Sequence, residues 1–212
     1  MTDHIESEFK LRARAQLEVA VVDAALRELD VRCRQSATRR HVDTYLDDSA
    51  GSLLRAGVGL RLRAAGAERS LTCKLRGSIE GCLHVRRELE APWPASTLPE
   101  RADELPAPVR GALRALLGDR ELRPHLRLEV RRDLRILTRA DADLCELAID
   151  TVTAIANDRA ADFQELELEV RSGVEANERL AHELRQRLPV EFARDDKPTH
   201  AAALLGLEQR PS

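Results

Sequence analysis

Aromatic side chains are scarce in this chain of 212 residues, where three Phe, one Trp and one Tyr make up 2% of the sequence. A protein that stacks many nucleic-acid bases on aromatic rings is therefore not expected. A large excess of charge of either sign is also missing, because 34 basic residues stand against 37 acidic ones. A nucleic-acid coat or a polybasic membrane binder would need a basic excess. We expect neither nucleic acid nor a membrane as a partner.

Paired cysteines and long apolar runs are lacking as well. The chain has four cysteines, with no CxxC pair and no histidine at zinc-finger spacing from them. This pattern predicts reduced thiols, as in a cytoplasmic protein. No apolar run approaches the ~18 residues of a membrane span, and the first ten residues are charged where a signal peptide would be apolar. We expect a single domain over residues 1–212, located in the cytoplasm.

Lysine is almost absent, so its positions carry information. Of the 34 basic residues, 31 are Arg and three are Lys, namely Lys10, Lys74 and Lys197. Each lysine is either a chance survivor in an Arg-rich background or a position that needs a compact ammonium instead of a broad guanidinium. The residue counts alone leave both interpretations open.

The hydrophobic pattern predicts strands with a few helices. Amphipathic helices are expected over residues 16–30, 108–120 and 175–188, with a short helix near Pro198. Residues 92–108 hold five of the nine prolines and predict a loop. Strands are expected over residues 3–12, 31–47 (a strand pair or one long bent strand), 122–138, 144–158 (a hairpin) and 163–173. Shorter strand candidates lie within residues 54–66, 69–77 and 84–92. With seven to nine strands and no βαβ rhythm, the sheet should be antiparallel.

Several of these strands alternate apolar residues with full charges. One such strand alone fits a solvated outer face, but here acids and bases are separated by strand, and few uncharged polar residues share the polar face. A closed barrel could turn this face inward, around a water-filled lumen. Inward Arg and Lys suit phosphate oxygens, and Glu clusters beside them require a hard divalent cation such as Mg²⁺ or Mn²⁺. The pattern therefore predicts a site for a metal–polyphosphate complex.

A series of motifs resembles those of the CYTH domains, also called triphosphate tunnel metalloenzymes, in particular the bacterial inorganic triphosphatases. The motifs are E-x-E-x-K at residues 6–10, YLDDSAGSLLRAGVGLRLR at 45–63, LTCKLRG at 71–77, R-x-E-x-E at 86–90, ELAID at 146–150, ELELEVRSG at 165–173 and DKPTHAAALLG at 196–206. The resemblance covers about residues 4–207. All three lysines fall on motif positions, which favours the functional interpretation of lysine.

The resemblance implies an α+β fold: an eight-stranded antiparallel β-barrel, or tunnel, with a charged lumen and flanking helices. It also implies Mg²⁺- or Mn²⁺-dependent hydrolysis of a small-molecule triphosphate. Carried over by position, the metal ligands would be Glu6, Glu8, Asp150, Glu165, Glu167 and Glu169. The substrate-binding residues would be Lys10, Arg61, Arg63, Lys74, Arg86, Arg132 and Lys197. The catalytic candidates are Lys10, Lys74, Glu88 and Glu90, of which either glutamate could position a water or simply orient Arg86.

One position in the long strand over residues 122–138 stays open. The resemblance selects Arg132 for the lumen. Strict alternation from Arg127 and Glu129, if those two residues faced the lumen, would instead turn Arg131 inward. A β-bulge between the two arginines would reconcile the assignments.

Inorganic triphosphate, or a triphosphate tail, is the favoured substrate because few aromatics are available to stack a base. A class IV adenylate cyclase, which forms cyclic AMP from ATP, is the first alternative. A non-catalytic polyphosphate- or nucleotide-binding module is the second. Asp196 and His200 depart from the Ser and Arg of the last motif, so phosphate contacts there should be weaker. The sequence leaves the assembly open, with a homodimer as one option.

Overall fold

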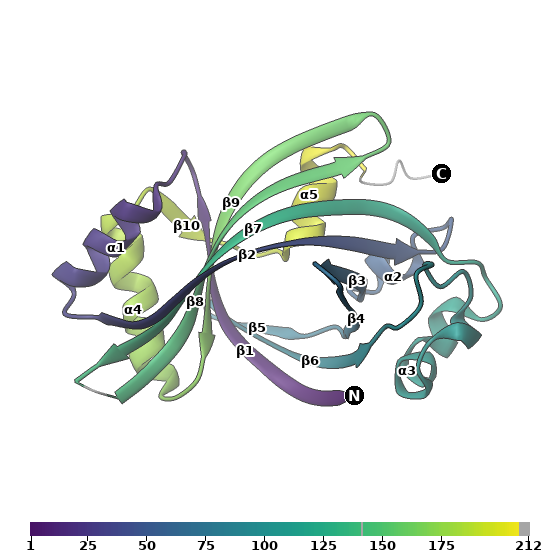
Figure 1. The fold of residues 1–212 in the computed structure, drawn as a ribbon, viewed down its shortest axis with the longest axis horizontal. Coiled ribbons are helices and arrows are strands. Elements are labelled where there is room, and N and C mark those ends of the chain that lie inside the picture. Colours follow the sequence, from purple (N-terminus) through teal and green to yellow (C-terminus); the bar gives the residue numbers. More distant parts are fainter. Residues whose placement is uncertain (141, 208–212) are drawn as a thin grey trace.

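The computed structural model describes residues 1–140 and 142–207, so residues 141 and 208–212 of the predicted domain lie outside the described part. Eight antiparallel strands close into a barrel, in the order β1–β9–β8–β7–β2–β3–β4–β6 and back to β1 (Figure 1). The fold is α+β, so the predicted eight-stranded antiparallel barrel is confirmed. The barrel strands are β1 (Thr2–Ala13), β2 (Arg32–Asp47), β3 (Gly59–Ala65), β4 (Glu68–Lys74), β6 (Leu83–Pro92), β7 (Arg123–Arg139), β8 (Ala142–Ala156) and β9 (Arg159–Val170).

Two short strands and five α-helices complete the described chain. The extra strands are β5 (Ser78–Glu80), which pairs with β6, and β10 (Val190–Phe192), which pairs with β1. The helices are α1 (Val19–Glu28), α2 (Ser52–Arg55), α3 (Ala107–Leu117), α4 (Val174–Arg187) and α5 (Lys197–Leu204), with one 3₁₀ turn, η1 (Ala102–Glu104). None of the described helices is long and apolar enough to cross a bilayer.

Strand β1 closes the barrel because it pairs with two different neighbours along its length. Its first part pairs with β6, with Glu6 opposite Arg86, and its second part pairs with β9, with Lys10 opposite Glu167. Side chains alternate along a strand, so these charged residues all face the inside while their apolar neighbours face outward. The register therefore determines which side chains reach the lumen.

The outward apolar faces pack against helices on two sides of the barrel. Phe9 and Leu11 of β1 belong to one buried cluster together with Leu26 of α1 and Leu184 of α4. A second cluster joins leucines of β3, β4 and β6 to Leu113 and other residues of α3. Figure 1 shows α1 with α4 at one end of the barrel and α3 at the other. These helices supply the apolar core, which leaves the lumen free to be charged.

The inner face is charged along only part of the barrel. On β7, alternation from Arg132 leads to Val130 and Leu128, which are buried in a third cluster with Ala201 of α5 and with Leu205. Helix α5 therefore covers an apolar stretch of the inner face, and its first residue stands where the charged stretch begins. This packing was not expected from the charge pattern.

The hairpin predicted for residues 144–158 is wrong. Strand β8 runs unbroken through Asp150 and Thr151, which lie opposite Glu165 and Gln164 of β9. The turn comes later, at Asn157, whose φ of 54° is left-handed. Thr151 and Thr153 interrupt the apolar run without breaking the strand, because the ladder with β9 continues past both.

Residues 31–47 form one strand instead of a pair. Strand β2 is 16 residues long and pairs with β7 throughout, with register shifts near Cys33 and near Tyr45. These irregularities account for the bent strand that was the other sequence-based option. The three main helices lie where they were predicted, with ends that differ by a few residues, and the short helix begins at Lys197. The described sheet has ten strands, one more than the upper expectation.

Gly77 lies in the connection between β4 and β5, where the backbone passes very close to β6. A Cβ at this position would overlap the carbonyl oxygen of Val85 and lie 2.7 Å from the Cβ of Arg86. We predict that Gly77→Ala lowers the free energy of unfolding by about 1–3 kcal/mol, as overpacking does. Gly111, in α3, has open space around its Cβ position, so Gly111→Ala should instead raise it by roughly 0.5–1 kcal/mol. Urea unfolding of both variants measures the difference, and unchanged stability of Gly77→Ala would refute the close approach.

Candidate active site

A cavity of about 240 Å³ lies within the barrel and is lined mainly by charged side chains. Its basic lining residues are Lys10, Arg61, Arg63, Lys74, Arg86, Arg132 and Lys197. Its acidic lining residues are Glu6, Glu88, Glu90, Glu167, Glu169 and Asp196. The structure thus brings together all seven residues predicted to bind substrate and both glutamates predicted as catalytic candidates. Three of the six predicted metal ligands do not line the cavity; these are the buried Glu8, Asp150 and Glu165.

One group of opposite charges centres on Glu167. The ammonium of Lys197 contacts Glu167 and lies 3.0 Å from both Asp150 Oδ2 and Glu165 Oε1. Arg132 donates to Asp150 at 2.6 and 2.8 Å and to Glu167 at 2.8 Å. Burial alone would raise the pKa of Glu167, but Lys197 and other bases outweigh it and hold that pKa well below its usual range. Against burial, Lys197 and Arg132 likewise hold the pKa of Asp150 below its usual value, so Asp150 and Glu167 are ionised and already neutralised by basic side chains.

A second group of opposite charges centres on Arg86. Its guanidinium donates to Glu6 Oε2 at 3.0 Å, Glu8 Oε1 at 2.8 Å and Glu88 Oε1 at 3.2 Å. Lys74 lies 3.2 Å from Glu6 and also contacts Glu88. Burial opposes ionisation of Glu88, but Lys74 and Arg86 overcome it and lower the pKa of Glu88 to about 2. Burial and the neighbouring Arg86 lower the pKa of Lys74, in spite of its two carboxylate partners.

The two other lysines have the opposite shift. Burial disfavours the ammonium of Lys10, but Glu8 and Glu167, at 3.0 and 3.1 Å, outweigh it and hold the pKa of Lys10 above its usual value. The pKa of Lys197 is raised against burial by its carboxylate partners as well. Lys74 is therefore the one lysine of the three whose ammonium form the protein disfavours. An anion bound beside it would stabilise that ammonium form.

Glu169 is the lining carboxylate with the clearest need for a cation. It lies opposite Glu8 in the β1–β9 ladder, and no ion pair joins it to another residue in the part of the chain that is described. Burial and the nearby Glu6, Glu146 and Glu8 raise the pKa of Glu169. A divalent cation among these oxygens would relieve the repulsion. The donor set of Glu6, Glu8 and Glu169 consists of hard oxygens and fits Mg²⁺ or Mn²⁺.

The two glutamates of β6 that were predicted as catalytic candidates, Glu88 and Glu90, differ in how many ionic partners they have. Glu88 is 4% exposed and is held by both Lys74 and Arg86. Glu90 lines the cavity, and within residues 1–140 and 142–207 its carboxylate has no hydrogen-bonded or ionic partner. The arrangement leaves Glu90 available for a water molecule, whereas Glu88 orients its two basic neighbours.

Arg132 faces the lumen and Arg131 does not. Arg131 is 46% exposed and pairs with Asp133 on the outside. Arg127 and Glu129, from which alternation would have turned Arg131 inward, are themselves outside and about half exposed. No bulge is needed, because regular alternation with Arg127 outside places Arg132 inside.

Sequence reasoning missed Asp43, a carboxylate that holds two lining arginines. Asp43 is 1% exposed and accepts from Arg63 at 2.7 and 2.8 Å and from Arg61 at 3.4 Å. Burial opposes its charge, yet the two guanidinium groups hold the pKa of Asp43 well below its usual range. Alternation of His41, Asp43 and Tyr45 in β2 was a usable signal, since this face lies opposite the arginines of β3.

Arg12 was also missed, although it continues the alternation of β1. Its guanidinium contacts Glu165 and lies 2.8 Å from Asp195 Oδ1.

Asp196, one of the motif departures, lines the cavity and lies 3.6 Å from Arg86. The carboxylate of Asp196 also accepts from the backbone N–H of Thr199 and so caps α5. The departure from Ser therefore keeps a helix cap while it adds a negative charge near the cavity.

Comparisons with known proteins agree with this architecture. Residues 4–195 match the CYTH domain, and the chain belongs to the CYTH domain family. The triphosphatases of this family are in general metal-dependent. A search of curated protein sequences returned no match.

Two solved structures resemble the whole chain at low sequence identity. One is HpAC1 from Hippeastrum, a candidate adenylyl cyclase described as having a dominant triphosphatase activity; its identity is 18% and its TM-score is 0.69, over 97% of this chain and 100% of that chain. The other is a candidate adenylate cyclase from Bacillus halodurans, with 16% identity and a TM-score of 0.63, over 94% and 98% of the two chains. At such identities the likeness establishes the fold.

The lowered pKa of Glu88 predicts a specific acid response. A carboxylate whose pKa is depressed on folding stabilises the protein above its unfolded pKa, near 4.5, and this stabilisation is lost as the pH falls through about 2. Glu88→Gln resembles the protonated form. The wild type should therefore exceed Glu88→Gln in free energy of unfolding by roughly 3 kcal/mol at pH 7, and the two should converge towards pH 2. Urea titrations at several pH values measure this, and a constant difference down to pH 2 would contradict it.

Proposed function

We propose that this protein is a divalent-metal-dependent triphosphatase that hydrolyses inorganic triphosphate, or a closely related triphosphate, to pyrophosphate and phosphate. The single observation that supports this most is the lumen itself, where seven basic side chains and six carboxylates line one cavity. Basic groups in such number favour a ligand with several negative charges. The carboxylates beside them favour a metal bound together with that ligand.

The cavity favours a substrate without a base. Of the five aromatic side chains in the chain, Tyr45 alone lines the cavity, and it is 4% exposed. Trp93 and Phe163 are buried among apolar residues elsewhere. Among the described residues, a nucleotide would therefore find no exposed Phe, Trp or Tyr ring in this lumen, and the aromatic rings that line it besides Tyr45 are the imidazoles of His4 and His41. A bare triphosphate needs only charged and hydrogen-bonding partners.

The reaction proposed is attack of water on a terminal phosphorus with pyrophosphate as the leaving group. Arg61 and Arg63, held by Asp43, and Lys74, whose charge is least secured, would bind phosphate oxygens and keep the chain in line. Glu6, Glu8 and Glu169 would hold the metal, which supplies charge neutralisation at the phosphate oxygens. Binding would exchange partners, because Arg86 would turn from Glu6 and Glu8 to phosphate.

Glu90 is the residue we propose to orient the attacking water. It lines the cavity without a basic partner among the described residues, so its carboxylate can accept a proton or a hydrogen bond from water. Lys10 and Lys197 line the cavity and contact Glu167, and they would bind the remaining phosphates.

A cyclase is the second candidate, because both similar structures are described as candidate cyclases. In that reaction the ribose hydroxyl of ATP would attack the α-phosphorus and release pyrophosphate with cyclic AMP. The two reactions use the same cations and differ in nucleophile and products. A binding module without turnover would hold its ligand with the same basic side chains and carboxylates.

A product panel separates these functions. We predict that purified protein with Mg²⁺ or Mn²⁺ releases phosphate faster from inorganic triphosphate than from ATP, GTP, thiamine triphosphate or pyrophosphate. Phosphate release and chromatography of nucleotides would be followed in parallel, with excess chelator as the control. Cyclic AMP and pyrophosphate as the main products would instead establish a cyclase, and tight binding without any product would establish a binding module.

Glu169 tests the metal assignment. We predict that Glu169→Gln lowers metal-dependent turnover at least about 30-fold, corresponding to roughly 2 kcal/mol of lost transition-state stabilisation, and shifts half-saturation to higher metal concentration. Glu129→Gln is the control, because Glu129 lies on the outer face of β7, is about half exposed and pairs with Arg127 away from the cavity. Equal metal dependence of wild type and Glu169→Gln would remove Glu169 from the metal site.

A further inference from the structure

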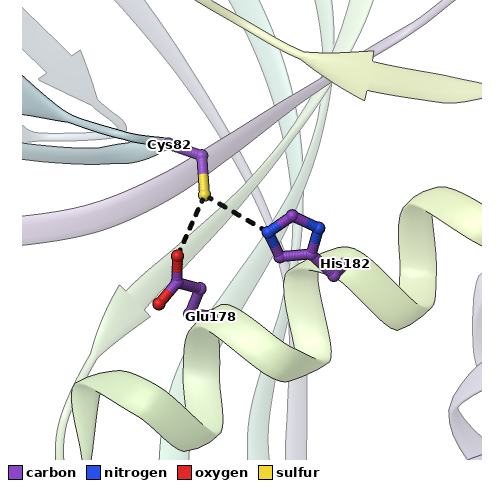
Figure 2. A group of neighbouring side chains, drawn as sticks. All are labelled: Cys82, Glu178 and His182. Carbon is purple, nitrogen blue, oxygen red and sulfur yellow. Dashed lines mark hydrogen bonds between the residues drawn. The ribbon is translucent and has the colours of Figure 1, made fainter.

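A second group of potential metal ligands lies away from the tunnel, between the β5–β6 hairpin and α4. Figure 2 shows Cys82, Glu178 and His182 with their side chains pointing toward one another. Cys82 Sγ lies 3.8 Å from Glu178 Oε1 and 3.9 Å from His182 Nε2. None of the three lines the charged cavity, and the proposed triphosphatase reaction uses none of them.

The fold positions each of these side chains separately. Cys82 follows Gly81, whose φ of 64° makes the turn between β5 and β6, and it is 9% exposed. Glu178 and His182 are four residues apart on α4, so they share one face of the helix. The ring of His182 packs edge-on against Phe192, with centroids 4.9 Å apart, which fixes its orientation.

We propose that Cys82, Glu178 and His182 bind a zinc ion. Thiolate, imidazole and carboxylate are the three protein ligand types that Zn²⁺ takes. A tetrahedral ion with Zn–S of about 2.3 Å and Zn–N of about 2.0–2.1 Å separates the sulfur and nitrogen by about 3.5 Å. The observed 3.9 Å exceeds this by only a few tenths of an ångström. Three protein ligands leave a fourth position for water.

The surroundings of the three side chains allow an ion to reach them. Glu178 and His182 are exposed on the helix surface and leave an entry path for the ion. The four cysteines give no zinc motif in the sequence because the histidine that meets Cys82 comes 100 residues later.

A zinc ion here would connect the β5–β6 hairpin to α4. Strand β6 carries Arg86, Glu88 and Glu90 into the lumen, so the ion would fix the strand that presents these residues. It would not replace the tunnel metal, whose proposed ligands are oxygens. An ion that binds only the folded state also stabilises it by mass action.

Cobalt substitution tests this site without depending on activity. Reduced, chelator-treated full-length protein is titrated with Co²⁺, whose thiolate charge-transfer absorption reports cysteine ligation and is silent for the tunnel carboxylates. We expect one equivalent to develop this band and Zn²⁺ to abolish it. Cys82→Ser should remove the band, and His182→Gln, a surface change that spares the core, should weaken metal binding by more than about 100-fold, since even outer-shell changes cost 10–100-fold.

The matched control is Cys33→Ser, which removes the exposed cysteine and should leave the band intact. With excess Mg²⁺ present to occupy the tunnel carboxylates, Zn²⁺ should raise the melting temperature of the wild type and of Cys33→Ser, but not that of His182→Gln. Absence of the band in the wild type, its persistence in Cys82→Ser or its loss in Cys33→Ser would each overturn the proposal.

Discussion

Pairing of charges inside a closed barrel is the constraint on which this structure depends. Full charges crowd the part of the inner face that α5 does not cover, and a buried charge without a partner costs several kcal/mol. Glu167 forms ion pairs with Lys10, Arg132 and Lys197, and Arg86 forms ion pairs with carboxylates of two strands, β1 and β6. These pairs offset the cost of burial. The resulting network is close to neutral without any ligand. A ligand can enter only if it replaces both kinds of partner at once.

This condition links the two components of the proposed substrate complex. A triphosphate alone would take Arg86 away from Glu6 and Glu8. Each of the two carboxylates would then keep one lysine, Lys74 or Lys10, which the triphosphate would also attract, beside Glu169, which has no ionic partner among the described residues. A divalent cation alone would meet carboxylates already occupied by Arg86. The two together exchange partners without leaving unpaired charge, which is a physical reason for the lumen to favour a metal–polyphosphate complex over either part. The same exchange would serve a cyclase, so the products decide between the two reactions.

Much of the fold could be predicted from the sequence because alternation and motif order are local properties. Alternation predicted the charged faces of β1 and of the other E-x-E strands, and the motif series implied closure of the barrel. The inner and outer faces of β7 were not, since charges occupy both: Arg127 and Arg131 lie outside and Arg132 inside. The turn placed near Asp150 was wrong because polar threonines resemble a turn, whereas the ladder with β9 continues past them.

The residues of the candidate site could be predicted in part, because many of them stand in recognisable motifs. Residues that stand in recognisable motifs were selected, whereas Asp43 lies outside the quoted motif segments and became visible only when β2 was paired with β3. Contacts between distant segments were beyond reach altogether. Cys82 and His182 carry no spacing signal, because the closure of the sheet and the docking of α4 bring them together.

The structure also offers a physical reason for lysine at position 197 in a chain that otherwise uses arginine. An ammonium has three N–H donors arranged around one point, and Lys197 Nζ contacts three carboxylates, those of Asp150, Glu165 and Glu167. A guanidinium is a planar fork suited to one or two carboxylates in its own plane, as Arg132 shows with Asp150. Three acceptors converging on one buried point, at 9% side-chain exposure, match the smaller ion. An arginine there would have to push its fork into the lumen or break one of these contacts, so the choice of lysine follows from the convergence of β8 and β9 on the start of α5.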